Sequence, residues 1–232
     1  MVQIAALFNG TFIASPEELL QKLQGIKAFV FDWDGVFNGG QKDEHGSSPF
    51  NEVDSMGTNM LRFNHYLRNG HPPVAAIITG ERNKTALAFA KREHFDAVYC
   101  GIKFKADALK DLCQKHQLKT EEIAFMFDDV LDFSAAALCG LRVMVNRTCN
   151  PLMTRYALDN KLVDYLTASD GANYAVREMV ELLTGLSGKY EDTMSERSAF
   201  TQNYQDYLTQ RTAVQTQLYT VENTQIIPID SL

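Results

Sequence analysis

The chain has 232 residues, of which 45% are apolar and 22% charged, a composition typical of a globular protein with a sizeable core. Its 22 basic and 29 acidic side chains give a formal net charge of −7, which makes nucleic acid or an anionic membrane a poor expected partner. No apolar run approaches the ~20 residues of a membrane-spanning helix. The first residues lack the basic side chains of a secretory signal, and the four cysteines form no CxxC pair. We therefore expect a cytoplasmic protein with reduced cysteines.

The first predicted element is a helix over residues 16–24. Ser15 offers a hydroxyl N-cap, Pro16 suits the first helical position, and Glu18 stands where a capping box requires it. A short apolar run over residues 26–31 follows. Its near-continuous hydrophobicity predicts a strand buried on both faces of a parallel sheet.

Similar apolar runs recur along the chain and alternate with segments of helical period. The later predicted strands cover residues 74–78, 97–99, 123–127 and 141–145. The predicted helices between them cover residues 55–68, 82–93, 105–116 and 131–138. This alternation predicts βαβ units, and hence an α/β fold with a Rossmann-like parallel sheet and helices on both faces.

Two segments depart from this rhythm. Residues 36–52 are rich in Gly and Ser, which predicts a β-hairpin flap between the first strand and its helix. In the polar stretch 187–232, Phe200, Tyr204 and Tyr207 recur at helical spacing. This pattern predicts an extra helix with one apolar face, followed by a less ordered end. We divide the chain into an N-terminal helical extension (1–24), a main domain (25–186) and a C-terminal helical extension or tail (187–232).

Two carboxylates directly follow the first predicted strand, in the sequence Asp32-Trp33-Asp34-Gly35. Ligands of open α/β sheets bind at the carboxyl ends of the strands. Two carboxylates that close together favour a bound cation, because the pair is costly to keep ionised without one. The alternative is a solvated turn, since Asp and Gly are common turn residues.

Polar residues follow the other strands as well. The second strand runs into Thr79-Gly80, where a hydroxyl and free N–H groups at a helix start can hold a phosphate, although Thr-Gly is also an ordinary turn. Lys105 follows the third strand and can either offset phosphate charge or lie at the surface. Asp128-Asp129 follow the fourth strand, with Asp132 further on; such residues can hold Mg²⁺ or cap a helix.

In this order, the four segments resemble the four motifs of the haloacid dehalogenase (HAD) superfamily of phosphotransferases. The resemblance implies that Asp32 is a nucleophile that forms an aspartyl-phosphate, and that Asp34 is the general acid and then the general base. It also implies a Mg²⁺ cofactor. The further implied residues are Thr79, Gly80 and Lys105 for the phosphoryl group; Asp32, the backbone carbonyl of Asp34, and Asp128 for Mg²⁺; and Asp129 and Asp132 in support.

The spacing of these segments leaves no room for a cap domain. Between Asp34 and Thr79 there are 44 residues, and between Thr79 and Lys105 there are 25. The chain therefore resembles the capless subfamily, and within it the 3-deoxy-octulosonate 8-phosphate and nonulosonate 9-phosphate phosphatases. The resemblance implies a phosphorylated sugar-acid substrate and a homo-oligomer, most often a tetramer. Glu81 and Asp54 favour the nine-carbon branch, and with Arg82 they are the expected specificity residues.

One departure from the family pattern motivates an alternative. Phe127 stands where the family usually has Gly before the acidic pair, so its ring could narrow the metal site. A degenerate HAD scaffold that binds a sugar phosphate or a partner protein is therefore one rival hypothesis. A broad phosphatase or nucleotidase of the same fold is the other.

Overall fold

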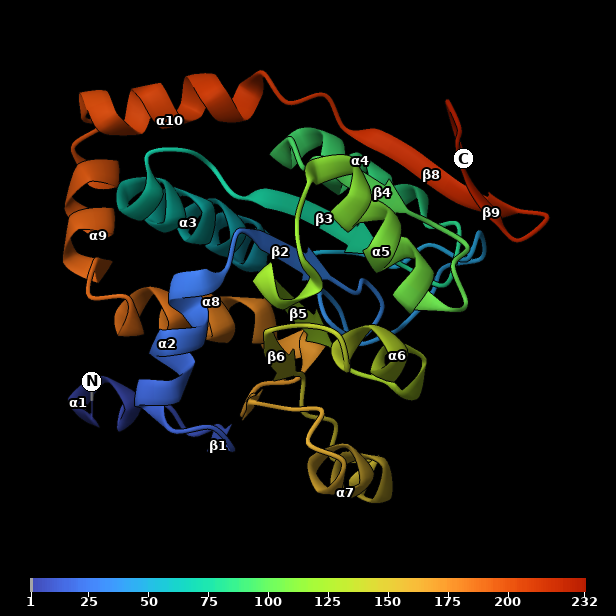
Figure 1. Cartoon of the computed structure of the whole chain (residues 1–232), viewed down its shortest axis with the longest axis horizontal. Coiled ribbons are helices and arrows are strands. Elements are labelled where there is room, and N and C mark those ends of the chain that lie inside the picture. The colour runs from blue at the N-terminus through green and yellow to red at the C-terminus, as the bar shows by residue number, and fades with distance from the viewer. Residues whose placement is uncertain (1) are drawn as a thin grey trace.

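A single sheet runs through the computed structural model, which describes residues 2–232 (Figure 1). Its strand order is β1-β7-β6-β5-β2-β3-β4-β8-β9. The seven strands from β7 to β8 are parallel, and the two edge strands, β1 and β9, are antiparallel to their neighbours. The strands are β1 Thr11–Phe12, β2 Ala28–Phe31, β3 Val74–Ile78, β4 Ala97–Tyr99, β5 Ile123–Phe127, β6 Leu141–Met144, β7 Tyr165–Leu166, β8 Gln217–Glu222 and β9 Gln225–Pro228.

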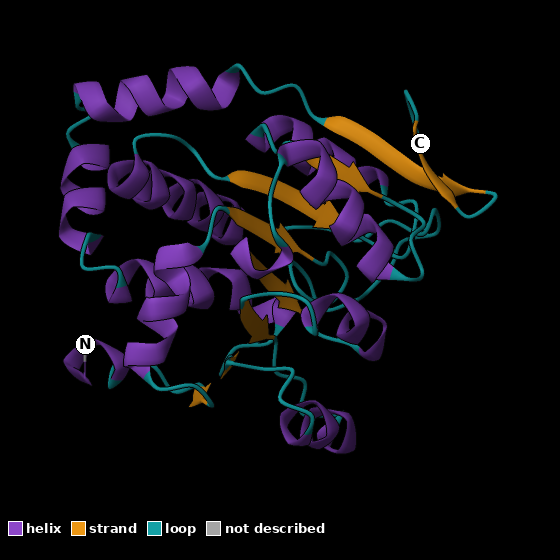
Figure 2. Cartoon of the chain, viewed as in Figure 1, coloured by secondary structure: helices purple, strands orange, loops and turns teal. Residues whose placement is uncertain are grey.

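Helices cover both faces of the sheet, as predicted (Figure 2). One face packs against α2, α3, α4 and α8, and the other against α5, α6 and α7. The sheet is therefore buried on both sides, which explains the continuous apolar runs of its central strands. The helices are α1 Val2–Ala5, α2 Pro16–Gly25, α3 Glu52–Asn69, α4 Lys84–Glu93, α5 Lys105–His116, α6 Phe133–Ala136, α7 Pro151–Asp159, α8 Ala175–Leu186, α9 Tyr190–Ser198 and α10 Gln202–Thr212.

The local signals at the start of α2 are confirmed. The Ser15 hydroxyl accepts a hydrogen bond from the Glu18 N–H (3.2 Å), and the Glu18 carboxylate accepts one from the Ser15 N–H (2.7 Å). This reciprocal pair satisfies two N–H groups that the first helical turn leaves free. It fixes the residue at which α2 begins.

The predicted flap, residues 36–52, contains no strand and ends where α3 begins at Glu52, so the predicted β-hairpin is wrong in its secondary structure. The Asp43 carboxylate accepts hydrogen bonds from the N–H groups of His45 and Ser47, at 2.9 and 2.8 Å. These bonds close a tight turn at the flap tip. The Gly and Ser residues on either side of that turn give the two arms no alternating apolar face, so a two-stranded hairpin there could not be stabilised by packing on the core.

The tail beyond α8 packs on its own chain. Tyr204 and Tyr207 of α10 are buried against Phe63 of α3, and the Tyr207 hydroxyl donates to the Asn59 carbonyl oxygen (3.2 Å). The predicted helix is confirmed, but the less ordered end is wrong, because β8 adds to the sheet beside β4 and turns back through β9. In Figure 1 the tail runs from α9 along α10 to this added edge.

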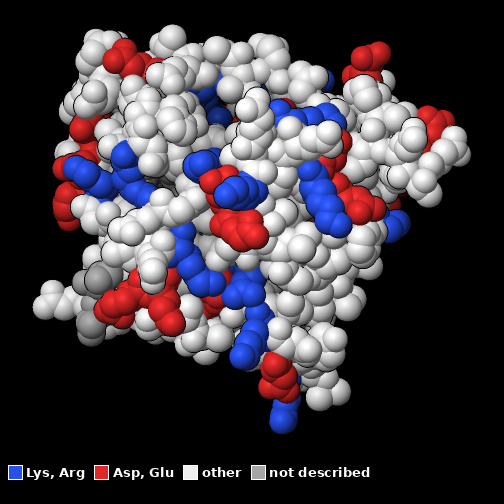
Figure 3. Space-filling view, in the orientation of Figure 1, with Lys and Arg blue, Asp and Glu red and all other residues white. Residues whose placement is uncertain are grey.

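Charges of both signs are interspersed over the face seen in Figure 3. Among residues 2–232, no helix combines the length and apolar character needed to cross a bilayer.

We predict that Tyr207→Ala lowers the free energy of unfolding by ~3–5 kcal/mol, the range for removing a large buried aromatic ring. Urea denaturation measures this change. Phe200→Ala is the control, because the Phe200 ring is 57% exposed and surface changes usually stay within about 0.5 kcal/mol. Equal stability of the two variants would show that the tail is not part of the core.

Candidate functional site

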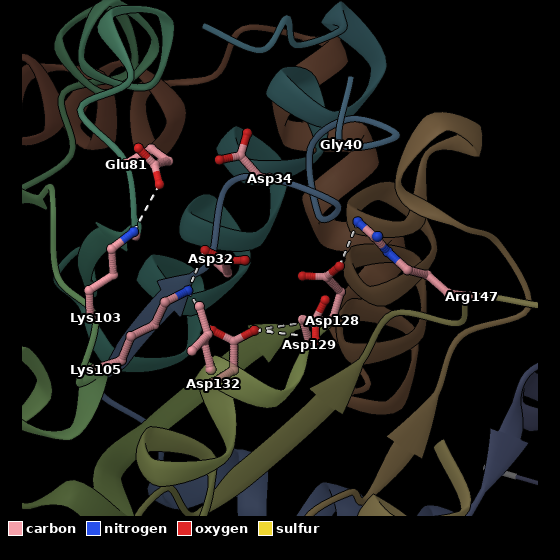
Figure 4. Close-up of a pocket in the computed structure, with 12 residues that line it drawn as sticks. Asp32, Asp34, Gly40, Glu81, Lys103, Lys105, Asp128, Asp129, Asp132 and Arg147 are labelled. Carbon is pink, nitrogen blue, oxygen red and sulfur yellow. Dashed lines mark hydrogen bonds and ion pairs between the residues drawn. The ribbon is translucent and has the colours of Figure 1, made fainter. Parts of the chain in front are cut away.

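The candidate site lies at the carboxyl ends of the parallel strands. β2 and β5 are hydrogen-bonded neighbours, and the Asp32 N–H continues their ladder by donating to the Met126 carbonyl oxygen (2.9 Å). This register places Asp32 beside Asp128, the first residue after β5. A cavity of about 250 Å³ opens there, and its side chains are drawn in Figure 4.

Three buried carboxylates form the floor of this cavity. One oxygen from each of Asp32, Asp128 and Asp132 lies within 4.8 Å of the others, and these residues are only 6%, 1% and 1% exposed. Lys105, the first residue of α5, bridges two of them: its Nζ lies 2.5 Å from Asp32 Oδ1 and 2.5 Å from Asp132 Oδ1. The Asp132 carboxylate also accepts from the Asp129 N–H (3.1 Å), which holds the turn after β5.

Burial and mutual repulsion disfavour the ionised forms of these acids. Burial, followed by the charge of Asp132, raises the pKa of Asp32 to about 6. Burial and the charges of Asp32 and Asp132 raise the pKa of Asp128 to about 9. The same carboxylates raise the pKa of Lys105, outweighing the opposite effect of its burial. Full ionisation of the cluster is therefore unfavourable unless a cation binds to it.

The residues present fit a divalent cation. Oδ1 of Asp128 is buried and has no hydrogen-bond partner. An unpartnered buried oxygen is costly, unless it donates a lone pair to a bound cation. Carboxylate oxygens are the ligands that Mg²⁺ prefers. The site therefore has both the donor atoms and the charge that such an ion requires.

Asp34 faces the cavity from a different side and is held by the flap. Lys42 Nζ lies 2.7 Å from Asp34 Oδ2, and the Ser48 hydroxyl donates to Asp34 Oδ1. The Asp34 side chain is 22% exposed, much more than the three buried acids. Asp34 is thus more accessible than those three acids to a molecule that enters the cavity.

The predicted phosphate-binding segment lies at the end of β3. Thr79 is fully buried, its hydroxyl accepts from the Glu81 N–H (3.4 Å), and Gly80 lines the cavity. Glu81 also lines the cavity and pairs with Lys103 across 2.8 Å. Asp129 reaches the rim, where its carboxylate accepts from the Val130 N–H (2.6 Å) and so acts as a helix cap.

Two predicted specificity residues do not line this cavity. Asp54 is fully buried, and its carboxylate accepts from the Arg177 N–H (2.8 Å) in the first turn of α8. It therefore joins α3 to α8. Arg82 is exposed beside Gly101. Phe127 also points away from the site: its ring is buried in the core near Phe125 and Phe133.

The sequence reasoning missed three cations that surround the cavity: Lys42, Lys103 and Arg147. Arg147 follows β6, and its Nη2 lies 2.7 Å from Asp128 Oδ2 (Figure 4). A signal for it was present, since β6 was predicted and Arg147 stands just after its carboxyl end. Lys42 and Lys103 lie in loops whose paths no periodicity predicts.

No family model matches the chain. The 3-deoxy-D-manno-octulosonate 8-phosphate phosphatase of Escherichia coli K12 is 27% identical over 183 residues, covering 77% of this chain and 90% of that protein. A crystal structure of the Moraxella catarrhalis phosphatase of the same name, with magnesium, phosphate and KDO, superposes with a TM-score of 0.65. It is 28% identical and covers 78% of this chain and 98% of its own.

A third protein, from Legionella pneumophila and described as a HAD superfamily subfamily III A hydrolase, also has a TM-score of 0.65. It is 26% identical and covers 79% of this chain and 95% of its own. In sequence and in fold, the chain therefore resembles the capless phosphatases of the HAD superfamily.

Proposed function

We propose that the chain is a Mg²⁺-dependent phosphomonoesterase that hydrolyses a 2-keto-3-deoxy sugar-acid phosphate through an aspartyl-phosphate. The observation that carries the proposal is the contact of Asp32 with Lys105 next to the free Oδ1 of Asp128. It combines a buried carboxylate, a cation and a ligand atom at the carboxyl edge of the sheet. Phosphoryl transfer is catalysed largely by such positioning and charge neutralisation.

In the first step, a carboxylate oxygen of Asp32 attacks phosphorus. The bond between phosphorus and the ester oxygen breaks, and that oxygen leaves with the electron pair and takes a proton from Asp34. Thr79, Gly80 and Lys105 hold the phosphoryl oxygens and offset their charge. Because Asp34 is paired with Lys42 in the structure, substrate binding must displace Lys42 before Asp34 can carry the proton.

In the second step, water attacks phosphorus of the aspartyl-phosphate and gives a proton to Asp34. The bond between phosphorus and Asp32 breaks, which releases inorganic phosphate and restores the nucleophile. Splitting one difficult displacement into two easier ones is the general advantage of covalent catalysis. Asp132 keeps Lys105 in place in both steps.

Mg²⁺ would be held by Asp32, Asp128 and the backbone carbonyl of Asp34. When bound, it neutralises charge between the attacking carboxylate and the phosphate. Support comes from the free Asp128 oxygen and from the magnesium ion named in the Moraxella structure.

The octulosonate 8-phosphate is the first candidate substrate, because it is the substrate named for the relatives. The nonulosonate 9-phosphate is the second. The argument for it from Asp54 is weakened, since that residue joins α3 to α8. Glu81 remains in its favour, because it lines the cavity and can accept hydrogen bonds from sugar hydroxyls.

We further propose a homo-oligomer, most simply a tetramer. The argument rests on the missing cap, since a neighbouring subunit would have to shield the intermediate from solvent. The tail no longer supports this proposal, because its aromatic face is covered by α3. Light scattering is expected to give a multiple of the 26.1 kDa chain mass, and a monomer at working concentration would contradict it.

We predict that Asp32→Asn lowers phosphate release by ~10⁴-fold or more, because an amide is a very poor nucleophile. Malachite-green detection of phosphate measures this loss. Asp192→Asn is the matched control, because the half-exposed Asp192 side chain in α9 forms an ion pair with Lys189 and does not line the cavity. Near-normal turnover by the Asp32→Asn protein would reject the nucleophile assignment.

The substrate class is tested with a panel of phosphomonoesters: both sugar-acid phosphates, nucleoside monophosphates and p-nitrophenyl phosphate. We expect a kcat/KM for a sugar-acid phosphate at least ~10-fold above that for nucleotides, the effect of about one good charged contact. Activity should disappear with a chelator and return with Mg²⁺. A preference for nucleotides would favour the broad phosphatase, and no release from any ester would favour the binding scaffold.

A further inference from the structure

Arg147 lies outside the four segments that resemble the HAD motifs, on the loop after β6. Two hydrogen bonds hold the start of that loop between the neighbouring segments. The Val145 N–H donates to the Phe127 carbonyl oxygen (2.7 Å) in β5, and the Asn146 N–H donates to the Thr167 hydroxyl (3.1 Å) just after β7. Its backbone therefore stands at a defined distance from the end of β5. From there the side chain reaches the acidic floor (Figure 4).

The loop that carries the predicted nucleophile is shaped around the Arg147 guanidinium. A Cβ added at Gly35 would lie 1.9 Å from Arg147 Nη2 and 2.1 Å from Asp128 Oδ2. A Cβ added at Gly40 would lie 3.1 Å from the same nitrogen. A side chain at position 35 would displace the guanidinium, and one at position 40 would crowd it. The contact between Arg147 and Asp128 is therefore enclosed by the chain and differs from a chance surface pair.

Two of the cations around the cavity contact the three buried carboxylates. Lys105 contacts Asp32 and Asp132, whereas Arg147 contacts Asp128. The two oxygens of Asp128 also differ. Oδ2 is held by Arg147 at 2.7 Å, and Oδ1 is buried without a partner.

We propose that Arg147 is a positioning residue for the metal ligand Asp128, an inference that rests on the proposed function. By holding Oδ2, the guanidinium fixes the carboxylate so that Oδ1 is presented to the cation. Groups that orient a ligand in this way typically account for ~10–100-fold in metal affinity. The planar guanidinium suits the task better than an ammonium group, because it binds a carboxylate in a defined orientation.

A competing effect acts in the opposite direction. Arg147 carries a positive charge close to the place of the metal ion, so repulsion alone would weaken binding, and removing the charge would strengthen it. Without Arg147, however, Asp128 would have both oxygens unpaired and would be free to turn toward Lys105. The proposal is that this loss of orientation exceeds the gain from reduced repulsion.

The test measures metal binding in the absence of substrate. Mn²⁺ prefers oxygen ligands as Mg²⁺ does, and the electron paramagnetic resonance signal of free Mn²⁺ gives its Kd for the full chain. We expect Arg147→Gln to raise this Kd by ~10–100-fold, and Arg147→Lys to raise it by a smaller factor. Arg155→Gln is the control, because it removes the same charge from an exposed side chain that pairs with Asp159.

Three outcomes would overturn the proposal. The first is unchanged or tighter Mn²⁺ binding by Arg147→Gln, which would make Arg147 a competitor of the ion. The second is an equal loss in Arg155→Gln, which would reduce the effect to net charge. The third is no Mn²⁺ binding by the unsubstituted chain. If Arg147→Gln does not fold, the Arg147→Lys protein decides by the same measure. Failure of the proposed function is distinct, because it appears as metal binding without phosphate release.

Discussion

Three carboxylates buried within 4.8 Å of one another are the constraint on which this structure depends. Burying one unpaired charge is strongly unfavourable, and neighbouring charges of the same sign add to the effect. Two cations, Lys105 and Arg147, offset part of this repulsion, and each contacts a different part of the cluster. Three carboxylates share these two cations, and Asp128 keeps one buried oxygen without a hydrogen-bond partner. Such a cluster must either hold a proton or take up a cation, and the proposed function uses the second option.

The parallel sheet makes such a cluster possible, because five adjacent strands deliver one segment each to the same edge. Asp32 directly follows β2, Thr79 directly follows β3, and Asp128 directly follows β5. Lys105 follows β4 and Arg147 follows β6, on opposite sides of the central strands. The two cations therefore approach the acids from opposite directions. Each position depends on a buried strand, so the site is as rigid as the core beneath it.

Sequence reasoning identified the parts of this arrangement that depend on local pattern. The apolar runs predicted β3, β4 and β5 with their observed bounds. Asp32 and Asp128 were found because they directly follow β2 and β5, and Lys105 because it follows β4 at the start of the next helix. The sequence did not predict features that depend on contacts between residues far apart in the chain. The strand β8 exists because it pairs with β4, more than a hundred residues earlier, and its polar ends lack a strong local signal. Asp54 was misplaced for the same reason, since only the fold shows that it meets α8.

The residues around the cavity fall into two groups that differ in burial. The pairs of Lys105 and Arg147 with the acidic cluster involve carboxylates that water hardly reaches, so losing one partner would leave a buried charge. The pairs Lys42–Asp34 and Lys103–Glu81 lie toward solvent, where an ion pair is worth only about 0–1 kcal/mol. Contacts that weak can be exchanged for contacts with a substrate at little loss. In the proposed reaction, the flap and the Lys103 loop can therefore adapt to the leaving group, while the buried residues keep the phosphoryl group in a fixed place. The two exposed pairs hold Asp34 and Glu81 in position until a substrate replaces Lys42 and Lys103 as their partners.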